Sequence, residues 1–450
     1  MHSKQETPAA QSSISLVTAT AIVVANMIGT GVFTSLGFQV GGLPSGFVLL
    51  FLWALGGVCA FCGAQAYGEL AAALPRAGGE YHFLSEIFHP AAGFVAGWAS
   101  ATAGFAAPVA LSAMAFGQYF QGVIPGLPAL GLSLGLVVAV SGVHLCSVRA
   151  GSVFQNAFTW GKVVLIVAFI AAGWFFGPVQ PLAFLPQAGD LGRIASAPFA
   201  VSLIYVMYAY SGWNAAAYIS SEVRDPARNL PRALLTGTLL VAVLYVGLNY
   251  IFLRTTPLDA LAGQLQIGSI AGARIFGPGG ERWVSGLISL ALISSISSMT
   301  WAGPRVTMVM GEDLWALRLL GRKTRRGIPA VAILFQLALV ILLLCTATFQ
   351  MALIYVQFTL LLCSFLTVLG MMVLRFRRPE LPRPYRAWGY PVTPLIFLGV
   401  TGWMMGYVVC TQPRESLAGL GTLALGLLLY YFSPRETKKT GPVSGAGFLG

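Results

Sequence analysis

The chain divides into twelve runs of mostly apolar residues, each about 20 residues long, and this division limits the possible folds more than any other feature. A helix of that length spans a bilayer, and backbone groups in lipid must be paired inside a helix or a closed barrel. Only 9% of the residues are charged, against about 25% in soluble domains. We therefore predict an all-α integral membrane protein with twelve transmembrane helices, centred near residues 24, 58, 103, 137, 164, 208, 243, 294, 338, 362, 400 and 423.

The positive charge is distributed unevenly between the predicted loops. If the N-terminus is cytoplasmic, 20 of the 26 Lys and Arg residues fall on the cytoplasmic side, five fall outside, and Lys162 remains within a span. This distribution follows the positive-inside rule, so the net charge of +12 does not indicate a nucleic-acid-binding protein. We expect a cytoplasmic tail over 1–13, one transmembrane domain over 14–432, and a second cytoplasmic tail over 433–450.

Two of the predicted spans are interrupted by Gly and small hydroxyl residues. The first span contains Asn-Met-Ile-Gly-Thr-Gly-Val-Phe at 26–33, and the sixth contains Tyr-Ala-Tyr-Ser-Gly-Trp-Asn at 208–214. They lie five spans apart, as corresponding elements of two inverted five-helix halves would. Glycine is also common in membrane helices for close packing, but paired interruptions at matching positions favour a transport site.

The chemistry of the two interruptions suits a zwitterion. A half-helix that begins at Gly31 presents free N–H groups and the positive end of its dipole, which favour a carboxylate. The half-helices that end near Met27 and near Tyr208 present carbonyl oxygens, which favour an ammonium group. The predicted substrate-binding residues are Met27, Ile28, Gly29, Thr30, Gly31, Tyr208, Ala209, Tyr210, Ser211 and Gly212.

Lys162 is the only basic residue in the middle of a predicted span. A charge in the bilayer centre costs about 2.5–3.5 kcal/mol on insertion scales, so an ionisable residue there indicates function. Ser152, Gln155 and Thr159 share its helical face, which indicates a polar interior rather than a side chain that reaches the membrane surface. The eighth span offers hydroxyl partners at Ser294, Ser295, Ser297, Ser298 and Thr300, of which Ser297 and Ser298 are the predicted coupling partners of Lys162.

Further roles follow from the surroundings of the sixth-span interruption. Tyr208 and Trp213 border it and are the predicted gate, with Asn214 in a supporting role. Glu69 lies near the cytoplasmic end of the second span, and we expect it to pair with a basic loop residue.

Several of these segments resemble the amino acid–polyamine–organocation superfamily, and within it the L-type amino acid transporter-like permeases. The similar segments include Ile-Gly-Thr-Gly-Val-Phe at 28–33, Pro-Arg-Ala-Gly-Gly-Glu-Tyr at 75–81, the sixth-span segment from 208 to 222, and the loop at 383–391. The resemblance implies a LeuT-type 5+5 inverted repeat with discontinuous helices 1 and 6, with repeats at about 14–176 and 196–374 and two extra helices at about 392–432.

The resemblance also implies roles for individual residues. It implies a substrate carboxylate at Thr30 and Gly31, an amine at the carbonyls of Met27, Tyr208, Ala209 and Ser211, and Lys162 in place of a sodium ion. The chain departs from the family in having Ser211 where relatives often have Gly, which alters the pocket. It also has no cysteine in the predicted outside loop 122–128, so we expect no disulfide-linked glycoprotein subunit.

The leading hypothesis is a sodium-independent secondary transporter of neutral L-amino acids, working by exchange or by proton coupling. No acid or arginine is evident at the interruptions, although cationic amino acids or polyamines remain alternative substrates on the same fold. A membrane-embedded enzyme would need a convergent His, Asp or Glu cluster, and a sensor would need a signalling domain; neither is evident. We expect no catalytic residue, metal or cofactor, and a bacterial inner membrane as the location.

Overall fold

The computed structural model describes residues 14–146, 151–314, 317–324 and 327–432, with only the backbone described at 151–158 and 221. The predicted tails, 1–13 and 433–450, lie outside the described residues. Within the described ranges the chain is all-helical, with no strand and a single isolated bridge between Ile14 and Val223. Ten of the described helical segments are long and apolar enough to cross a membrane, and this chain is therefore a multi-pass membrane protein.

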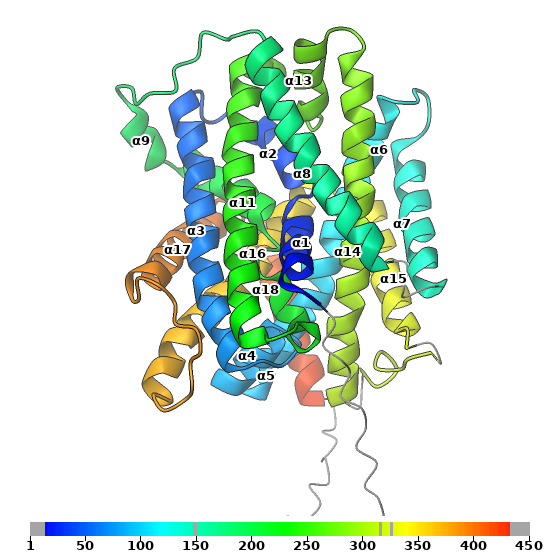
Figure 1. Ribbon diagram of the computed structural model, residues 1–450, viewed down its shortest axis with the longest axis vertical. Helices are drawn as coiled ribbons and strands as arrows, with labels where there is room; N and C mark the ends of the chain where they lie inside the picture. The colour runs from blue at the N-terminus through cyan, green and yellow to red at the C-terminus, as the bar shows by residue number, and fades with distance from the viewer. Residues whose placement is uncertain (1–13, 147–150, 315–316, 325–326, 433–450) are drawn as a thin grey trace, which may run out of the picture.

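The helices follow one another in the order shown in Figure 1. They are α1 (Leu16–Met27), α2 (Gly31–Gln39), α3 (Gly46–Ala73), α4 (Glu80–Ile87), α5 (Pro90–Ala99), a π-helical segment η1 (Ser100–Ala106), α6 (Ala107–Gln121), α7 (Ala129–Cys146), α8 (Gly151–Phe176), α9 (Asp190–Ile194), α10 (Ala197–Tyr210), a 3₁₀ segment η2 (Ala215–Glu222), α11 (Pro226–Thr255), α12 (Leu258–Leu261), α13 (Ile267–Phe276), α14 (Gly280–Asp313), α15 (Ala330–Thr346), α16 (Phe349–Arg377), α17 (Val392–Thr411) and α18 (Pro413–Phe432).

Twelve spans were predicted, and two of them coincide with helices shorter than the ten long segments. These are α10, with 14 residues, and α15, with 17 residues. Twelve crossings and the inverted repeat therefore stay predictions. The third predicted span is one continuous segment, 90–121, but its middle is π-helical at Ser100–Ala106. Such wide turns often occur at functional sites.

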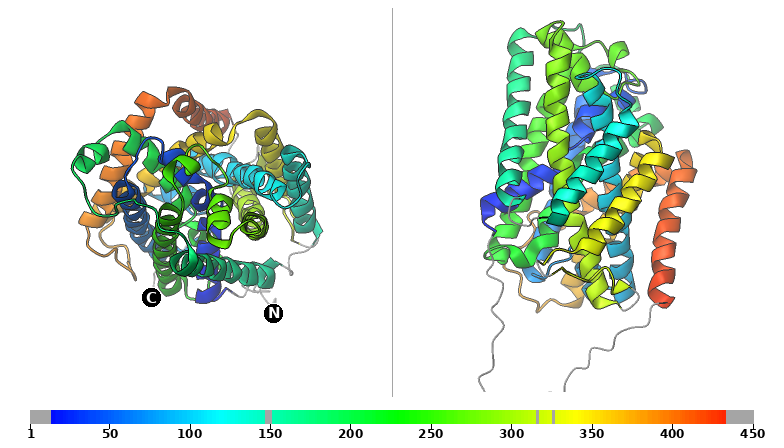
Figure 2. Two further views of the ribbon diagram at one scale, coloured as in Figure 1. Left: turned by 90° about the horizontal axis from the view of Figure 1, so that it is seen from above. Right: turned by 90° about the vertical axis from the view of Figure 1, so that its right-hand side faces the viewer.

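The broken first span lies inside the bundle. α11 packs along α3 and α1, and α14 packs along α6 and α13. All but one residue of the run 31–39 is buried, whereas α18 lies at the periphery (Figure 2). The helices that carry the two interruptions are thus enclosed by the long spans.

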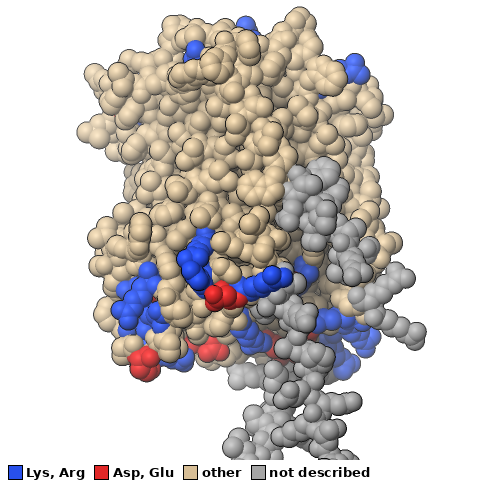
Figure 3. All heavy atoms as spheres, viewed as in Figure 1, with Lys and Arg blue, Asp and Glu red and all other residues tan. Residues whose placement is uncertain are grey.

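Basic side chains gather at one end of the molecule. Figure 3 shows most Lys and Arg of that face at the lower end, few at the upper end, and an uncharged band between them. We call this lower end the basic end. Arg76 follows the end of α3, Arg305 lies toward the end of α14, and Arg375 lies in the last turn of α16. The uncharged band is what a surface in contact with lipid requires.

Glu69 at the basic end pairs as predicted. Its carboxylate is 2% exposed and accepts hydrogen bonds from both Arg375, at the end of α16, and the backbone N–H of Ala387. Arg383, in the loop that follows α16, lies 3.4 Å away. A buried carboxylate needs a paired positive charge and hydrogen-bond donors. This buried network therefore holds α3 against the loop between α16 and α17.

Short helices cover α2 at the opposite end. Gly263 N–H donates to the carbonyl of Gly37 at 2.8 Å, and the hydroxyl of Tyr119 donates to the carbonyl of Phe33 at 2.7 Å. That hydroxyl in turn accepts from Gly268 N–H, in α13, at 3.3 Å. The segment 255–282 therefore packs over α2 rather than forming an open loop.

Candidate substrate site

The first span is broken where the sequence predicts. α1 ends at Met27 and α2 begins at Gly31, and the N–H of Gly29 turns back to the carbonyl of Met27 at 2.8 Å. The break frees the carbonyl of Ile28 from helical pairing and leaves the first N–H groups of α2 without partners in the preceding turn. A span with both kinds of free group at mid-depth must face protein or a cavity.

The sixth span is broken after Tyr210. Ser211 is extended, with φ −57° and ψ 152°, and Gly212 has φ +94°, in the left-handed region that favours glycine. The chain resumes as the 3₁₀ segment η2 from Ala215. A long run of apolar helix formers cannot continue through this pair, because Gly212 turns the backbone out of the helical path.

The two breaks lie directly against each other. A Cβ on Gly31 would stand 2.4 Å from Ala209 Cα, and a Cβ on Gly212 would stand 2.8 Å from the backbone of Asn26. The hydroxyls of Thr30 and Tyr208 are 3.2 Å apart. The structure therefore brings the predicted first-span residues 27–31 against the sixth-span residues 208–212, and only glycine permits this approach.

Tyr210 is the exception among the predicted substrate residues. Its hydroxyl donates to the carbonyl of Trp53, on α3, at 3.1 Å, and its ring packs against Tyr245 at a centroid distance of 5.1 Å. The side chain is fully buried between α10 and α3. Its side chain thus packs against α3 and α11, and its predicted role in substrate binding stays a prediction.

Lys162 reaches the first break from α8. Its ammonium donates to the carbonyl of Ile28 at 3.2 Å and to the Ser295 hydroxyl at 2.7 Å, and the side chain is 3% exposed. The Ser295 hydroxyl lies 2.9 Å from the same carbonyl. One ammonium thus joins α8, the first break and α14, and Lys162 does not reach for the membrane surface.

The predicted coupling serines need correction. Ser297 lies against His144 at 2.9 Å, and Ser298 donates to the carbonyl of Ser295 at 2.9 Å. Neither makes a hydrogen bond to Lys162 in the described structure. Ser297, two residues after Ser295, points to roughly the opposite side of α14, and Ser298 lies nearly one turn further along the helix. Thr159 is buried on α8, while the side chains of Ser152 and Gln155 lie outside the described residues.

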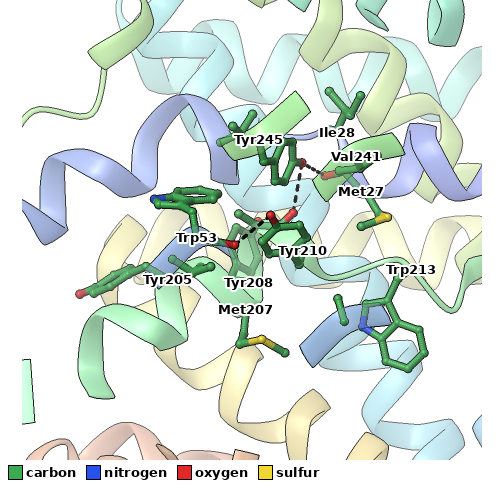
Figure 4. Close-up of a cluster of buried hydrophobic side chains, with 14 of the residues drawn as sticks. Met27, Ile28, Trp53, Tyr205, Met207, Tyr208, Tyr210, Trp213, Val241 and Tyr245 are labelled. Atoms are coloured by element: carbon green, nitrogen blue, oxygen red, sulfur yellow. Dashed lines mark hydrogen bonds between the residues drawn. The ribbon is translucent and has the colours of Figure 1, made fainter. Parts of the chain in front are cut away.

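Tyr245 is a central residue that sequence reasoning missed. Its hydroxyl, on α11, lies 2.6 Å from the carbonyl of Met27 and 3.2 Å from that of Ala209, so it touches both breaks (Figure 4). The side chain is fully buried. The available signal was a polar hydroxyl in the middle of an apolar span, which needs a hydrogen-bond partner when buried.

The two predicted gate residues lie on different sides of the second break. Tyr208 is 5% exposed and faces Thr30. Trp213 is 5% exposed and packs edge-on against Tyr67 at a centroid distance of 4.7 Å. Asn214, the predicted supporting residue, donates to the Glu80 carboxylate at 3.4 Å. Tyr208 can shield the breaks themselves, and Trp213 the space beyond them.

A cavity of about 60 Å³ adjoins the second break. Its wall includes Ser211, Gly212, Trp213 and Asn214 from the break, and Glu80 and Gln357 from α4 and α16. The π-helical segment contributes Gly104 and Phe105. The wide turns of the third span therefore contribute to the wall of a cavity beside the interrupted sixth span.

Comparison with known proteins gives matches along nearly the whole chain. A family described as amino acid permease matches residues 14–416. Similar proteins include b(0,+)-type amino acid transporter 1 of Mus musculus, 27% identical over 439 residues, covering 95% of this chain and 88% of the relative. Asc-type amino acid transporter 1 of Mus musculus is 28% identical over 448 residues, covering 95% and 82%.

A third relative bears on possible partners. Large neutral amino acids transporter small subunit 2 of Rattus norvegicus is 28% identical over 439 residues, covering 94% of this chain and 81% of the relative. Its name describes one subunit of a larger assembly. The comparisons therefore do not support the expectation that this chain has no protein partner.

Proposed function

Because the chain belongs to the amino acid permease family, whose matched relatives are named as transporters and not as enzymes, we propose that it carries neutral L-amino acids across the membrane by alternating access. The observation that supports this most is the contact between the two breaks, with Gly31 against Ala209 and Gly212 against Asn26. α1 and α10 end at this contact with free carbonyl groups and a partial negative charge, and α2 begins there with free N–H groups and a partial positive charge. One small zwitterion can reach both.

The substrate carboxylate binds at the N–H groups of Thr30 and Gly31, where α2 begins. The substrate amine binds at the carbonyls of Met27, Tyr208, Ala209 and Ser211. Two of these carbonyls already meet the Tyr245 hydroxyl, but a carbonyl oxygen has two lone pairs and can accept a second donor. Tyr208 and Trp213 close the site on either side.

Lys162 replaces a sodium ion in this mechanism. A fixed ammonium that holds the carbonyl of Ile28 and the Ser295 hydroxyl supplies the positive charge that a bound cation would supply. Transport is then independent of sodium. Exchange and proton coupling are both compatible with a lysine at this place, since its charge either stays fixed or is lost during the cycle.

Cationic amino acids and polyamines are the second candidate substrates. One specific observation favours them: the buried carboxyl of Glu80 lies in the wall of the cavity beside the second break. Competition by basic amino acids against uptake of a labelled neutral amino acid separates the two candidates. If basic amino acids compete as strongly as neutral ones, the substrate range would include cationic amino acids.

The membrane orientation follows from the charge distribution. The basic end is cytoplasmic by the positive-inside rule, which puts both termini in the cytoplasm, and the inner membrane of a bacterium is the proposed location. The segment 122–128 has no cysteine, so a glycoprotein partner would associate without a disulfide at that loop. Purification of the protein from its native membrane under non-reducing conditions, followed by identification of any co-purifying subunit, tests whether it has a disulfide-linked partner.

The proposed function is tested by thermal stabilisation of the purified protein with each of the twenty amino acids, with and without sodium. A ligand at about 100 times its Kd stabilises the folded state by about 2.7 kcal/mol. We expect a subset of neutral amino acids to raise the melting temperature equally in both media. Sodium dependence would contradict the role of Lys162, and the lack of any effect would contradict the zwitterion site.

A further inference from the structure

Glu80 is a buried acid that the proposed zwitterion site does not use. It is the first residue of α4, between the second and third spans, and its side chain is 1% exposed. Gly79 before it has φ +53°, so the chain turns sharply to direct α4 inward from the loop. The side chain forms part of the wall of the cavity beside the second break.

Among the described residues, the side-chain hydrogen bonds of Glu80 all go to one oxygen. Oε1 accepts from the hydroxyl of Tyr67 on α3, from the hydroxyl of Ser364 on α16 at 2.9 Å, and from the amide of Asn214 at 3.4 Å. The second oxygen, Oε2, is buried and has no partner among the described residues. Glu80 therefore connects α3, α16 and the end of the second break through Oε1, and Oε2 remains available to bind a proton or a water molecule.

No cation neutralises this carboxyl among the described residues. Three titratable groups interact electrostatically with Glu80. They are Tyr67 on α3, Tyr218 on η2 and Cys363 on α16, and none of them carries a positive charge. The helix α5, which packs along α4, has no titratable residue. On α4 itself, the Tyr81 hydroxyl donates to Asp313, and Glu86 lies 4.0 Å from Arg378. None of these groups places a positive charge against Glu80.

The arginines of the basic end are engaged with other acids or with a backbone carbonyl. Arg76 lies 3.4 Å from Asp313, Arg305 lies 3.5 Å from Glu222, and Arg375 and Arg383 share Glu69, while Arg377 donates to the carbonyl of Ile87. His82, the remaining basic group of α4, has its pKa lowered by burial and by Arg76, so it favours the neutral form. Burying a carboxylate without a neighbouring cation costs free energy, because the charge loses its hydration. The carboxyl avoids this cost when it binds a proton and becomes neutral.

The surroundings make proton exchange feasible near neutral pH. Burial raises the pKa of Glu80 to about 7, although its three hydrogen bonds act to lower it. The adjoining cavity of about 60 Å³ has room for roughly four water molecules, since one water needs about 10–15 Å³. Gln357 in the cavity wall also has an oxygen with no partner among the described residues, which a water can satisfy.

We propose that Glu80 is a proton-binding site whose protonation loosens the hold of α3 and α16 on the second break during transport. A proton from cavity water binds Oε2, and the carboxylate becomes a neutral carboxyl. Hydrogen bonds to a carboxylate are about twice as strong as those to a neutral group, so the contact with Asn214 weakens. This inference rests on the proposed transport function and adds a proton site separate from Lys162.

The first test measures exchange of a labelled neutral amino acid in proteoliposomes, with equal pH on both sides, at about one unit below and about one unit above pH 7. We expect the native rate to fall roughly fivefold over this range as Glu80 ionises. E80Q cannot ionise, and its rate should stay near the native low-pH rate throughout. E80D should restore a pH-dependent rate, and E86Q, which removes an exposed acid of the same helix, should keep the native profile.

An E80Q profile that still follows the native one would overturn the proposal. So would an E80Q variant that keeps the native profile and loses only competition by basic amino acids, because Glu80 would then hold a cationic side chain of the substrate. A second measurement does not depend on transport. The infrared band of a protonated carboxyl should be present below pH 7, absent above it, and missing from E80Q at both.

The two tests separate this inference from the proposed function. If the native protein exchanges no amino acid at any pH, the proposed function fails, while the infrared titration still decides whether Glu80 binds a proton. If exchange occurs but no carboxyl band titrates near pH 7, the proton site is wrong and the transport function stands.

Discussion

Lys162 is the residue on which the sodium-independent mechanism depends. K162A removes an ammonium that holds Ile28 and Ser295, and hydrogen bonds to charged groups contribute about 1.5–3 kcal/mol each. Two such bonds together contribute at least about 3 kcal/mol, so we expect amino acid exchange in proteoliposomes to fall by roughly 100-fold or more. The matched control is K323A, because Lys323 is half-exposed and pairs with the exposed Glu312 at 2.9 Å. Near-native exchange by K162A would contradict the coupling role.

The hydroxyl of Tyr245 contacts both breaks, so a substitution there tests whether the two breaks act together. Y245F keeps the ring and removes the hydroxyl whose single proton is shared between the carbonyls of Met27 and Ala209. Its loss leaves a buried carbonyl without this donor, at a cost of about 1–2 kcal/mol. We expect exchange to fall by roughly 5- to 30-fold. Y250F on the same helix is the control, since Tyr250 packs by its ring against Phe184 at 4.8 Å. Equal rates for the two variants would show that the Tyr245 hydroxyl is dispensable.

At the scale of elements, the glycines decide how closely the two broken helices approach. G212A forces a side chain into the left-handed region and within 2.8 Å of Asn26, and we expect a loss of about 1–3 kcal/mol. The readout is the midpoint of thermal unfolding in detergent. G161A on α8 is the control, because its Cβ meets nothing within 4 Å and alanine is the better helix former. A G212A midpoint equal to that of G161A would mean that the breaks can separate without cost.

The same elements show what the sequence could predict and what it could not. Both breaks were predictable because Gly and small hydroxyl residues interrupt apolar runs at mid-span, and a broken helix needs such residues. The contact of Lys162 with Ser295 rather than Ser297 or Ser298 was not, because it depends on how α8 and α14 are rotated against each other. Glu80 was visible only as part of a motif; its burial arises from elements far apart in the chain.

At the scale of the whole molecule, the ten long spans and the basic end were predictable from hydropathy and charge, whereas the π-helical segment was not. Wide turns leave no local sequence signature, since they arise from packing around a cavity. The shortness of α10, by contrast, follows from the predictable break at Ser211, which ends the helix after 14 residues. The orientation of the bundle in the membrane is the whole-molecule property that an experiment can fix.

Three exposed cysteines near helix ends report that orientation. Cys146 ends α7, close to the pocket that also holds Arg305 and Lys323, while Cys345 and Cys410 lie near the ends of α15 and α17, which both begin at the basic end. If the basic end is cytoplasmic, a membrane-impermeant maleimide added to intact cells should label single-cysteine variants that retain Cys345 or Cys410. The variant that retains Cys146 should react only after the cells are permeabilised.

The buried Cys59 supplies the control for this labelling, because its thiol is shielded in α3 and should stay unlabelled in both conditions. Labelling of Cys146 from outside, with Cys345 and Cys410 protected, would reverse the orientation. Glu80 begins α4, which lies toward the basic end (Figure 1), so that result would make the proposed proton site of Glu80 sense the external rather than the cytoplasmic pH. The labelling pattern therefore decides from which side a proton reaches Glu80, and against which gradient the substrate moves.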